Sequence, residues 1–283
     1  MEFKPIVVIT TFNRESIFWN LFESLDTELV DVLIVQDGLI VQTYTKKFYD
    51  LDGNEDGVNI ISSEPQMGIG HSKKLGTEYA LGNGYENIFI IEDDVEIKNN
   101  DVWDFCINFK TKTGLKHFNW NDYRSNTLKA KYEIAGQNVS IHQNVEGSFS
   151  YFHKDCFDIS EWDDKYFNAY EHVDLEYQLI QKKLIPPFWN FASPSNLGEY
   201  LKVSDNNQST ITPNRNDPKP KEVIYKNNLV NASNRWSQKW GNKPNPSGIG
   251  DKGLERTLLR LKAIQNKYGV PDAKKRGRKP KPN

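Results

Sequence analysis

The chain of 283 residues has little cysteine and no long apolar run. Its two cysteines, Cys106 and Cys156, are too few for a zinc cluster, and we expect both to be reduced. The longest apolar stretches, residues 6–9 and 88–91, are far shorter than the roughly 18 residues of a membrane span. The first 30 residues lack the basic start and apolar core of a signal peptide. We therefore expect a cytoplasmic protein with no membrane partner.

What the chain does contain is typical of a soluble globular protein: 26% charged and 12% aromatic residues. Its net charge of −2 is unevenly distributed. Residues 271–283 hold six basic residues and one acid, whereas residues 1–270 hold 30 basic against 37 acidic residues. An acidic body with a basic tail predicts that the tail seeks a polyanion.

Four short apolar runs predict the strands of a sheet, at residues 6–10, 32–35, 59–61 and 88–91. Helical patterns lie between them, at residues 14–25 and 72–81. This alternation predicts an α/β fold with a mainly parallel, Rossmann-like sheet flanked by helices. Two more helices are expected later in the chain, at residues 172–184 and 252–268.

Polar side chains follow three of the predicted strands. They are Thr10, Thr11, Asn13 and Arg14 after the first strand, Asp37 after the second, and Glu92, Asp93 and Asp94 after the fourth. Ligands of open α/β sheets bind outside the carboxyl ends of the strands, so we expect these groups to share one site. Asp37 is placed there to accept hydrogen bonds from a base or ribose.

The three consecutive carboxylates are the strongest chemical signal. Clustered like charges repel unless a cation neutralises them. Mg²⁺ and Mn²⁺ take one or two protein carboxylates and complete their shell with water and substrate phosphates. The triplet therefore predicts a nucleotide diphosphate held through one divalent ion. The alternative is an acidic strand-to-loop junction that is simply solvated.

Several motifs, in order along the chain, resemble those of family 2-like nucleotide-sugar glycosyltransferases with the GT-A fold. KPIVVITTFNR at residues 4–14, DVLIVQDG at 31–38 and IIEDDVEI at 90–97 resemble the donor-binding half. QMGIGHSKKLGTEYAL at 66–81 resembles the turn and helix beside the diphosphate. NRWSQKWG at 234–241 resembles the closing segment of many members.

The resemblance implies a division of the chain. Residues 1–100 would be the donor half and 101–250 the acceptor-binding and catalytic half of the same domain. Residues 251–270 would form a C-terminal helix, followed by a disordered basic tail at 271–283. The resemblance also implies a donor, most commonly a UDP-sugar, bound with one Mn²⁺ or Mg²⁺.

Carried over to this sequence, the resemblance implies roles for particular residues. Asp37 would contact the nucleotide base, Asp94 would bind the metal, and Asp93 would touch the ribose or the metal. The resemblance also makes Gly147 the start of a sugar-facing loop. On their own chemistry, Lys73, Lys74 and His71 could contact the diphosphate, although lysines on helices are usually only solvated, and Trp240 could stack on a sugar or pack in the core.

The resemblance places the catalytic base within residues 171–174. An inverting transfer needs a group that deprotonates the acceptor hydroxyl, and Glu171, His172 and Asp174 are all chemically able. We favour Glu171, because helical geometry puts Asp174 on nearly the same face and His172 about 100° away. His172 would then be a hydrogen-bonded packing residue. No histidine follows it, so the late histidine metal ligand of some family members is missing, and metal binding would be either weak or completed by water.

The tail sequence KKRGRKPK at residues 274–281 resembles an AT-hook. Its core would be Arg276, Gly277 and Arg278, but Lys279 stands where the usual motif has proline. Glycine lets the backbone approach the floor of the minor groove, and the narrow A·T groove attracts arginine. The alternative is a generic basic terminus that binds any polyanion.

A glycosyltransferase with a DNA-binding tail predicts double-stranded DNA as its acceptor, namely hydroxymethylated pyrimidines such as certain bacteriophages carry in the host cytoplasm. A tethered hook would raise the local concentration of duplex. One alternative is a transferase for surface polysaccharide or glycoprotein, and another is a non-catalytic DNA-binding module. A nucleotidyltransferase is disfavoured, because no glycine-rich phosphate loop lies between Thr10 and Arg14. The oligomeric state, the sugar and the nucleotide stay open.

Overall fold

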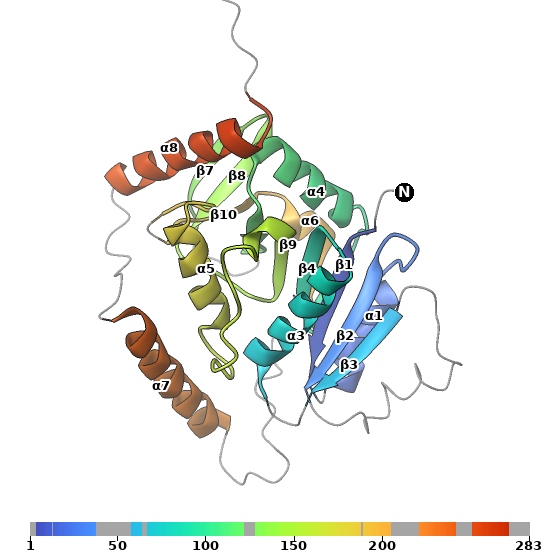
Figure 1. Ribbon diagram of the computed structural model, residues 1–283. Coiled ribbons are helices and arrows are strands. Elements are labelled where there is room, and N and C mark those ends of the chain that lie inside the picture. The colour runs from blue at the N-terminus through green and yellow to red at the C-terminus, as the bar shows by residue number, and fades with distance from the viewer. Residues whose placement is uncertain are drawn as a thin grey trace, which may run out of the picture.

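A six-stranded sheet in the order β3-β2-β1-β4-β9-β6 forms the centre of the computed structural model (Figure 1). The structure describes residues 4–12, 14–37, 58–63, 67–121, 128–187, 189–204, 221–241 and 251–271. The strands are β1 (Ile6–Thr11), β2 (Asp31–Asp37), β3 (Val58–Ser63), β4 (Asn87–Glu92), β6 (His117–Asn119) and β9 (Phe149–His153). The four strands expected from the apolar runs are confirmed.

The first four strands of this sheet are parallel to one another. β9 runs antiparallel to β4 and to β6. Because β1 is covered on both faces, every residue from Ile6 to Thr11 is buried. The predicted α/β class, with a mainly parallel sheet flanked by helices, is confirmed.

Helices cover both faces of the sheet, as the period of two along β1 requires. Val7 and Ile9 pack into one apolar cluster with residues of α1, α4 and α8, and Ile6 and Val8 pack into the other with residues of α3 and α5. The helices are α1 (Glu15–Ser24), α3 (Ile69–Gly82), α4 (Val102–Thr113), α5 (Glu171–Gln181), α6 (Leu197–Tyr200), α7 (Lys221–Trp240) and α8 (Asp251–Tyr268). Among the helices of these ranges, none has the length and apolar character that a bilayer crossing requires.

Two small sheets and a short helix complete the described architecture. One small sheet has the order β10-β8-β7 and the other pairs β11 with β5. Their strands are β5 (Val95–Ile97), β7 (Leu128–Ile134), β8 (Gln137–His142), β10 (Phe191–Pro194) and β11 (Leu201–Val203), and a 3₁₀ helix, η1, spans Lys154–Cys156. β5 follows the acidic triplet directly, so its antiparallel pairing with β11 holds the segment just after those carboxylates.

Two helix boundaries differ from the sequence prediction. α3 begins at Ile69, three residues before the expected start, because Gly68 adopts a φ of +87° that turns the chain into the helix. α5 ends at Gln181 rather than at residue 184. Lys183 has a φ of 63°, and Leu184 N–H donates to the Leu179 carbonyl, which closes the helix in a Schellman turn before the prolines are reached.

α7 is a long helix that the sequence did not reveal as one. Its last turns pack Trp236 and Trp240 against Tyr177 of α5 and against Trp189. The expected C-terminal helix is confirmed as α8, which lies along β7 and α4 (Figure 1).

A close approach in α3 gives a stability prediction. A Cβ at Gly76 would lie 2.3 Å from Val8 Cγ1, whereas a Cβ at Gly82 of the same helix meets nothing within 4 Å. We expect Gly76→Ala to lower the free energy of unfolding by about 1–3 kcal/mol, because overpacking must push the helix off β1. Gly82→Ala is the matched control and should be neutral or stabilising by up to about 1 kcal/mol. Urea denaturation of both variants measures the difference, and equal effects would contradict this packing.

Candidate active site at the carboxyl edge of the sheet

The polar groups expected at the strand ends do gather at one edge of the sheet. Thr10 pairs in register with Glu92, so the end of β1 lies beside the end of β4. Asp37 ends β2, the other neighbour of β1. The carboxyl ends of parallel strands meet at the same edge, as predicted. Thr10 Oγ1 is buried there without a hydrogen-bond partner among the described residues.

Asp93 is tied inward to the loop that follows β1. Its side chain is fully buried, forms an ion pair with Arg14 and accepts a hydrogen bond from Thr11 Oγ1 at 2.8 Å. Burial raises the pKa of Asp93 to about 6, although the Arg14 guanidinium opposes this rise. Burial disfavours the charge of Arg14 too, but Asp93 and Asp94 outweigh it and raise the pKa of Arg14. Both oxygens of Asp93 are therefore engaged by the protein itself.

The carboxylate of Asp94 makes fewer contacts with the protein than that of Asp93. Its Oδ2 lies 3.6 Å from Arg14 Nη1, and its buried Oδ1 has no hydrogen-bond partner within the described part of the chain. The residue is 9% exposed, in contrast to the fully enclosed Asp93. Burial and then the charge of Glu92 raise the pKa of Asp94, while Arg14 opposes them. An orphaned carboxylate oxygen of this kind is a suitable ligand for a hard cation.

Lys73 joins the end of β4 to the start of α5. Its ammonium is 3.1 Å from Glu92 Oε1, 3.1 Å from Glu171 Oε1 and 3.4 Å from the Gly147 carbonyl. The side chain is 1% exposed, and burial alone would lower its pKa, but the two carboxylates outweigh burial and raise it. Lys73, expected beside the diphosphate, thus has its charge already shared between two glutamates.

Glu171 and His172 begin α5 as a hydrogen-bonded pair. Glu171 Oε1 lies 2.9 Å from His172 Nδ1. Burial would raise the pKa of Glu171, but Lys73 and His172 hold it well below its usual range. The pKa of His172 is raised, because Glu171 outweighs the effect of burial. A Cβ at Gly147 would lie 3.1 Å from His172 Nδ1 and 3.2 Å from Lys73 Nζ, so a larger residue in this loop would have to displace one of these two side chains slightly.

Negative charge exceeds positive charge in this cluster. It contains the four carboxylates of Glu92, Asp93, Asp94 and Glu171 against the two permanent cations of Arg14 and Lys73. The excess favours a further cation, and the orphaned Oδ1 of Asp94 is the oxygen that would take it. In the ranges that the structure describes, no group of three or more His, Cys, Asp or Glu side chains is arranged around a metal position. A divalent ion here would need substrate and water oxygens, which Mg²⁺ usually retains.

Asp37 organises the turn into α3. Its Oδ1 accepts hydrogen bonds from Met67 N at 2.9 Å and from Ser63 Oγ at 3.3 Å, and its Oδ2 accepts one from Gly68 N at 2.9 Å. A carboxylate has about four acceptor positions, so one remains for a ligand. Next to this turn, His71 has its Nδ1 buried without a partner among the described residues. Lys74 faces outward and pairs with Asp164 at 3.0 Å.

Asp174 holds α7 against α5 through its hydrogen bonds. Its Oδ1 accepts from Trp240 Nε1 at 2.6 Å, and its Oδ2 accepts from Lys239 Nζ at 2.7 Å and from Gln178 Nε2 at 3.0 Å. The residue has no exposed surface. Asp163 adds to the fastening through Arg235, at 2.7 Å. Trp240, expected near the acceptor sugar, packs against Tyr177 in this interface. Asn13 and residues 276–279 lie outside the described residues.

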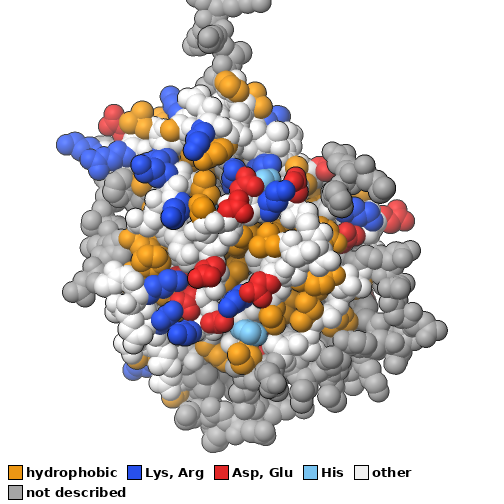
Figure 2. All heavy atoms as spheres, in the orientation of Figure 1, with side chains coloured by type: hydrophobic (Ala, Val, Ile, Leu, Met, Phe, Trp, Pro, Cys, Tyr) orange, Lys and Arg blue, Asp and Glu red, His pale blue; other side chains and the backbone are white. Residues whose placement is uncertain are grey.

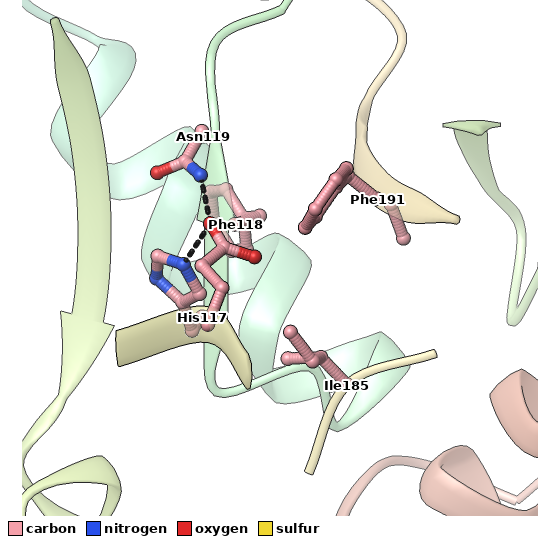
Figure 3. A pocket seen from close by; sticks show the side chains of 7 residues that line it. His117, Phe118, Asn119, Ile185 and Phe191 are labelled. Atoms are coloured by element: carbon pink, nitrogen blue, oxygen red, sulfur yellow. Dashed lines mark hydrogen bonds and ion pairs between the residues drawn. The ribbon is translucent and has the colours of Figure 1, made fainter. Parts of the chain in front are cut away.

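Sequence reasoning missed a second buried polar cluster, formed by His117, Asn119 and Glu176, which lines a small pocket (Figure 3). His117 Nε2 lies 2.8 Å from Glu176 Oε1, which also accepts from the Asn119 amide, and His117 Nδ1 lies 2.8 Å from the Tyr151 carbonyl. Glu176 is four residues after His172, which puts it one turn further along α5. The spacing of four residues between His172 and Glu176 is the feature of the sequence that could have indicated Glu176. Nothing in the sequence near His117 indicated its partner.

Comparison with known proteins gives only distant likenesses. No family model and no curated protein matches the chain. Solved structures similar to it include S. aureus TarS 1–349, with a TM-score of 0.49 and 11% identity over 93% of this chain and 81% of that one. The same protein in complex with UDP has a TM-score of 0.47 and 12% identity, over 93% of this chain and 83% of that one. Mannosyltransferase PcManGT from Pyrobaculum calidifontis, in complex with GDP-Man and Mn²⁺, has a TM-score of 0.44 and 10% identity over 94% and 88%. Likeness at this level assigns neither family nor activity.

Proposed function

We propose that this protein is a metal-dependent glycosyltransferase of the GT-A type, which moves a sugar from a nucleotide diphosphate sugar to a hydroxyl acceptor. The observation that carries the proposal is the juxtaposition of two groups at one sheet edge. Asp94, with its orphaned oxygen, stands on the donor side, and the Glu171–His172 pair stands at the start of α5. Lys73 contacts both Glu92 and Glu171 and so links the two sides. An acid-rich metal position next to a proton acceptor is what transfer to a hydroxyl requires.

The residues present fit a divalent metal. Asp94 would hold it, with Asp93 behind it fixing the loop through Arg14 and Thr11. A bound Mn²⁺ or Mg²⁺ would stabilise the negative charge that develops on the departing diphosphate. Arg14, already shared between Asp93 and Asp94, would orient those carboxylates and approach the phosphates.

The donor would lie along the ends of β1 and β2. Thr10 has a free hydroxyl oxygen there, and His71 has a free ring nitrogen at the start of α3, both judged among the described residues. The remaining acceptor position of Asp37 suits an N–H of the base. The likeness to a UDP complex and to a GDP-mannose complex with Mn²⁺ makes UDP- and GDP-sugars the first donors to try.

The acceptor we propose is a hydroxymethylated pyrimidine of double-stranded DNA, as found in certain bacteriophages. The tail sequence around Arg276–Gly277–Arg278 supports this, because it suits an A·T minor groove. α8, which leads into the tail, has five basic and two acidic residues in its sequence, and Lys and Arg side chains gather over it in Figure 2. A glycan acceptor for a surface polysaccharide or glycoprotein is the other candidate, since the site itself does not depend on the tail.

A transfer screen tests both levels of the proposal. The full chain is incubated with labelled UDP- and GDP-sugars, with Mn²⁺ or Mg²⁺, and with hydroxymethylated duplex, plain duplex or glycan. We expect metal-dependent transfer to hydroxymethylated duplex alone. Transfer only to glycan would overturn the DNA acceptor, and absence of both transfer and donor hydrolysis with every donor would overturn the transferase.

A truncation tests the tail separately. A chain that ends at Pro271 should lose DNA-dependent turnover and its salt sensitivity, because phosphate contacts and the tether disappear. Donor hydrolysis should stay unchanged, since the residues of the sheet edge remain. Unchanged turnover on DNA would contradict a role for the tail.

A further inference from the structure

We propose that His172 is the catalytic base, accepting the proton of the acceptor hydroxyl at Nε2, and that Glu171 is its positioning residue. This inference rests on the proposed glycosyl transfer and names the group that performs its proton step. The hydrogen bond between Glu171 Oε1 and His172 Nδ1, at 2.9 Å, carries it together with the exposure of the candidate groups.

Exposure separates the three residues that are chemically able to act. The side chain of His172 is 23% exposed, that of Glu171 is 4% exposed, and that of Asp174 is 0% exposed. A base must come within hydrogen-bond reach of the acceptor hydroxyl, which arrives from solvent. Asp174 is excluded because Trp240 and Lys239 occupy its oxygens. Of the three, His172 is therefore the group that an acceptor can touch.

The hydrogen bond to Glu171 prepares the imidazole for this role. With Nδ1–H donating to an ionised carboxylate, the neutral ring keeps its lone pair on Nε2. Within the described ranges the only hydrogen bond seen for the His172 ring is the one at Nδ1, so Nε2 is the nitrogen available to an incoming hydroxyl. Glu171 itself is a poor base, because Lys73 and His172 hold its pKa well below its usual range.

The proton step balances. As the acceptor oxygen attacks the anomeric carbon, its O–H bond breaks and the proton moves to Nε2, giving an imidazolium. The new C–O bond replaces the bond from the anomeric carbon to the diphosphate oxygen, and that bonding pair leaves with the diphosphate. Glu171 stabilises the imidazolium through the Nδ1–H bond until the proton passes to water.

The charges around His172 set the direction of its pH dependence. On α5 it faces Glu171 and, one turn further along, Glu176, while Lys73 faces it from α3 and Gly147 lies beside the ring. Burial and Lys73 lower the pKa of His172, but the carboxylates outweigh them and raise it above 6.5. Because the neutral ring is the active form, turnover should rise with pH through this raised value.

Two variants test the assignment with the most active donor and acceptor of the screen. His172→Gln should lose about 10²–10⁴-fold in kcat and lose the acidic limb of the pH profile. Glu171→Gln keeps an oxygen acceptor for Nδ1–H but removes the charge, so the acidic limb should move down by about 1–3 pH units. His153→Gln, remote from the site and beside Asp155, is the control and should leave both kcat and the profile unchanged.

Direct titration by nuclear magnetic resonance separates this inference from the proposed function. The chain has five histidines, so the ring signals of His172 are assignable by comparison with His172→Gln. Its pKa should lie above 6.5 and fall in Glu171→Gln, without any substrate present. If the pKa of His172 behaves as expected but no donor gives turnover, the transferase is overturned and the Glu171–His172 hydrogen bond still stands. Turnover with a wild-type rate and profile in His172→Gln would overturn the inference and leave the transferase standing.

Discussion

Asp94→Asn is expected to lower metal-dependent turnover about a thousandfold. The orphaned Oδ1 would be replaced or neutralised, so the ion would lose its charged protein ligand. A metal that stabilises the leaving diphosphate contributes several kcal/mol, and about 4 kcal/mol corresponds to that factor. The measurement is turnover against Mn²⁺ concentration, with the half-saturating concentration expected to rise steeply.

The stability of the Asp94→Asn variant distinguishes a metal-binding role of Asp94 from a purely structural one. Burial and Glu92 raise the pKa of Asp94, which means that its ionised form costs stability once the pH passes its unfolded value near 3.9. Without metal at pH 7, the free energy of unfolding of the variant should therefore be at least as large as that of the wild type. Glu96→Gln, a carboxylate two residues further along and paired with Lys202, should affect neither turnover nor the metal response. Full Mn²⁺ stimulation in Asp94→Asn would contradict the metal assignment.

Asp174→Asn is expected to destabilise the protein by about 3 kcal/mol and to loosen α7. The asparagine amide would face the donors of Lys239 and Gln178 and leave the lysine charge without its partner. Breaking one side of a buried ion pair costs about 3–5 kcal/mol, and the partial exposure of Lys239 places this pair at the low end. Urea unfolding measures the loss, and hydrogen exchange along residues 221–240 should report faster opening of α7.

A double-mutant cycle decides whether Asp174 stabilises the packing of α7 or serves as the catalytic base. Lys239→Met should reproduce most of the loss, and combining it with Asp174→Asn should add little. Asp164→Asn breaks a half-exposed pair with Lys74 and should cost less than about 1 kcal/mol. A large loss of kcat in Asp174→Asn at wild-type stability, absent from Lys239→Met, would instead make Asp174 the base.

The strands could be predicted because their signal is local. A strand buried on both faces needs a run of β-branched apolar residues, and the runs ending at Thr11 and Glu92 satisfy this without reference to the rest of the chain. Parallel pairing then brings the polar residues that follow each run to one edge. The fold class and the gathering of Arg14, Asp93 and Asp94 followed from pattern alone.

The orientation of each carboxylate did not follow in the same way. Asp93 and Asp94 are adjacent and chemically identical, yet Arg14 and Thr11 enclose one and leave an oxygen of the other unpaired. Asp174 shares a helix with Glu171, yet α7 arrives from more than 60 residues away and occupies it. Nothing in the spacing of residues 171–174 records that contact.

By itself the sequence determined the four parallel strands, the helices between them and which edge of the sheet is acidic, because hydrophobic period and strand-end polarity are properties of short segments. The tertiary structure alone decided which carboxylates are paired with other groups of the protein and that the His172 ring is partly exposed to solvent. Those outcomes depend on burial and on charges brought together from distant segments, as when Lys73 meets both Glu92 and Glu171.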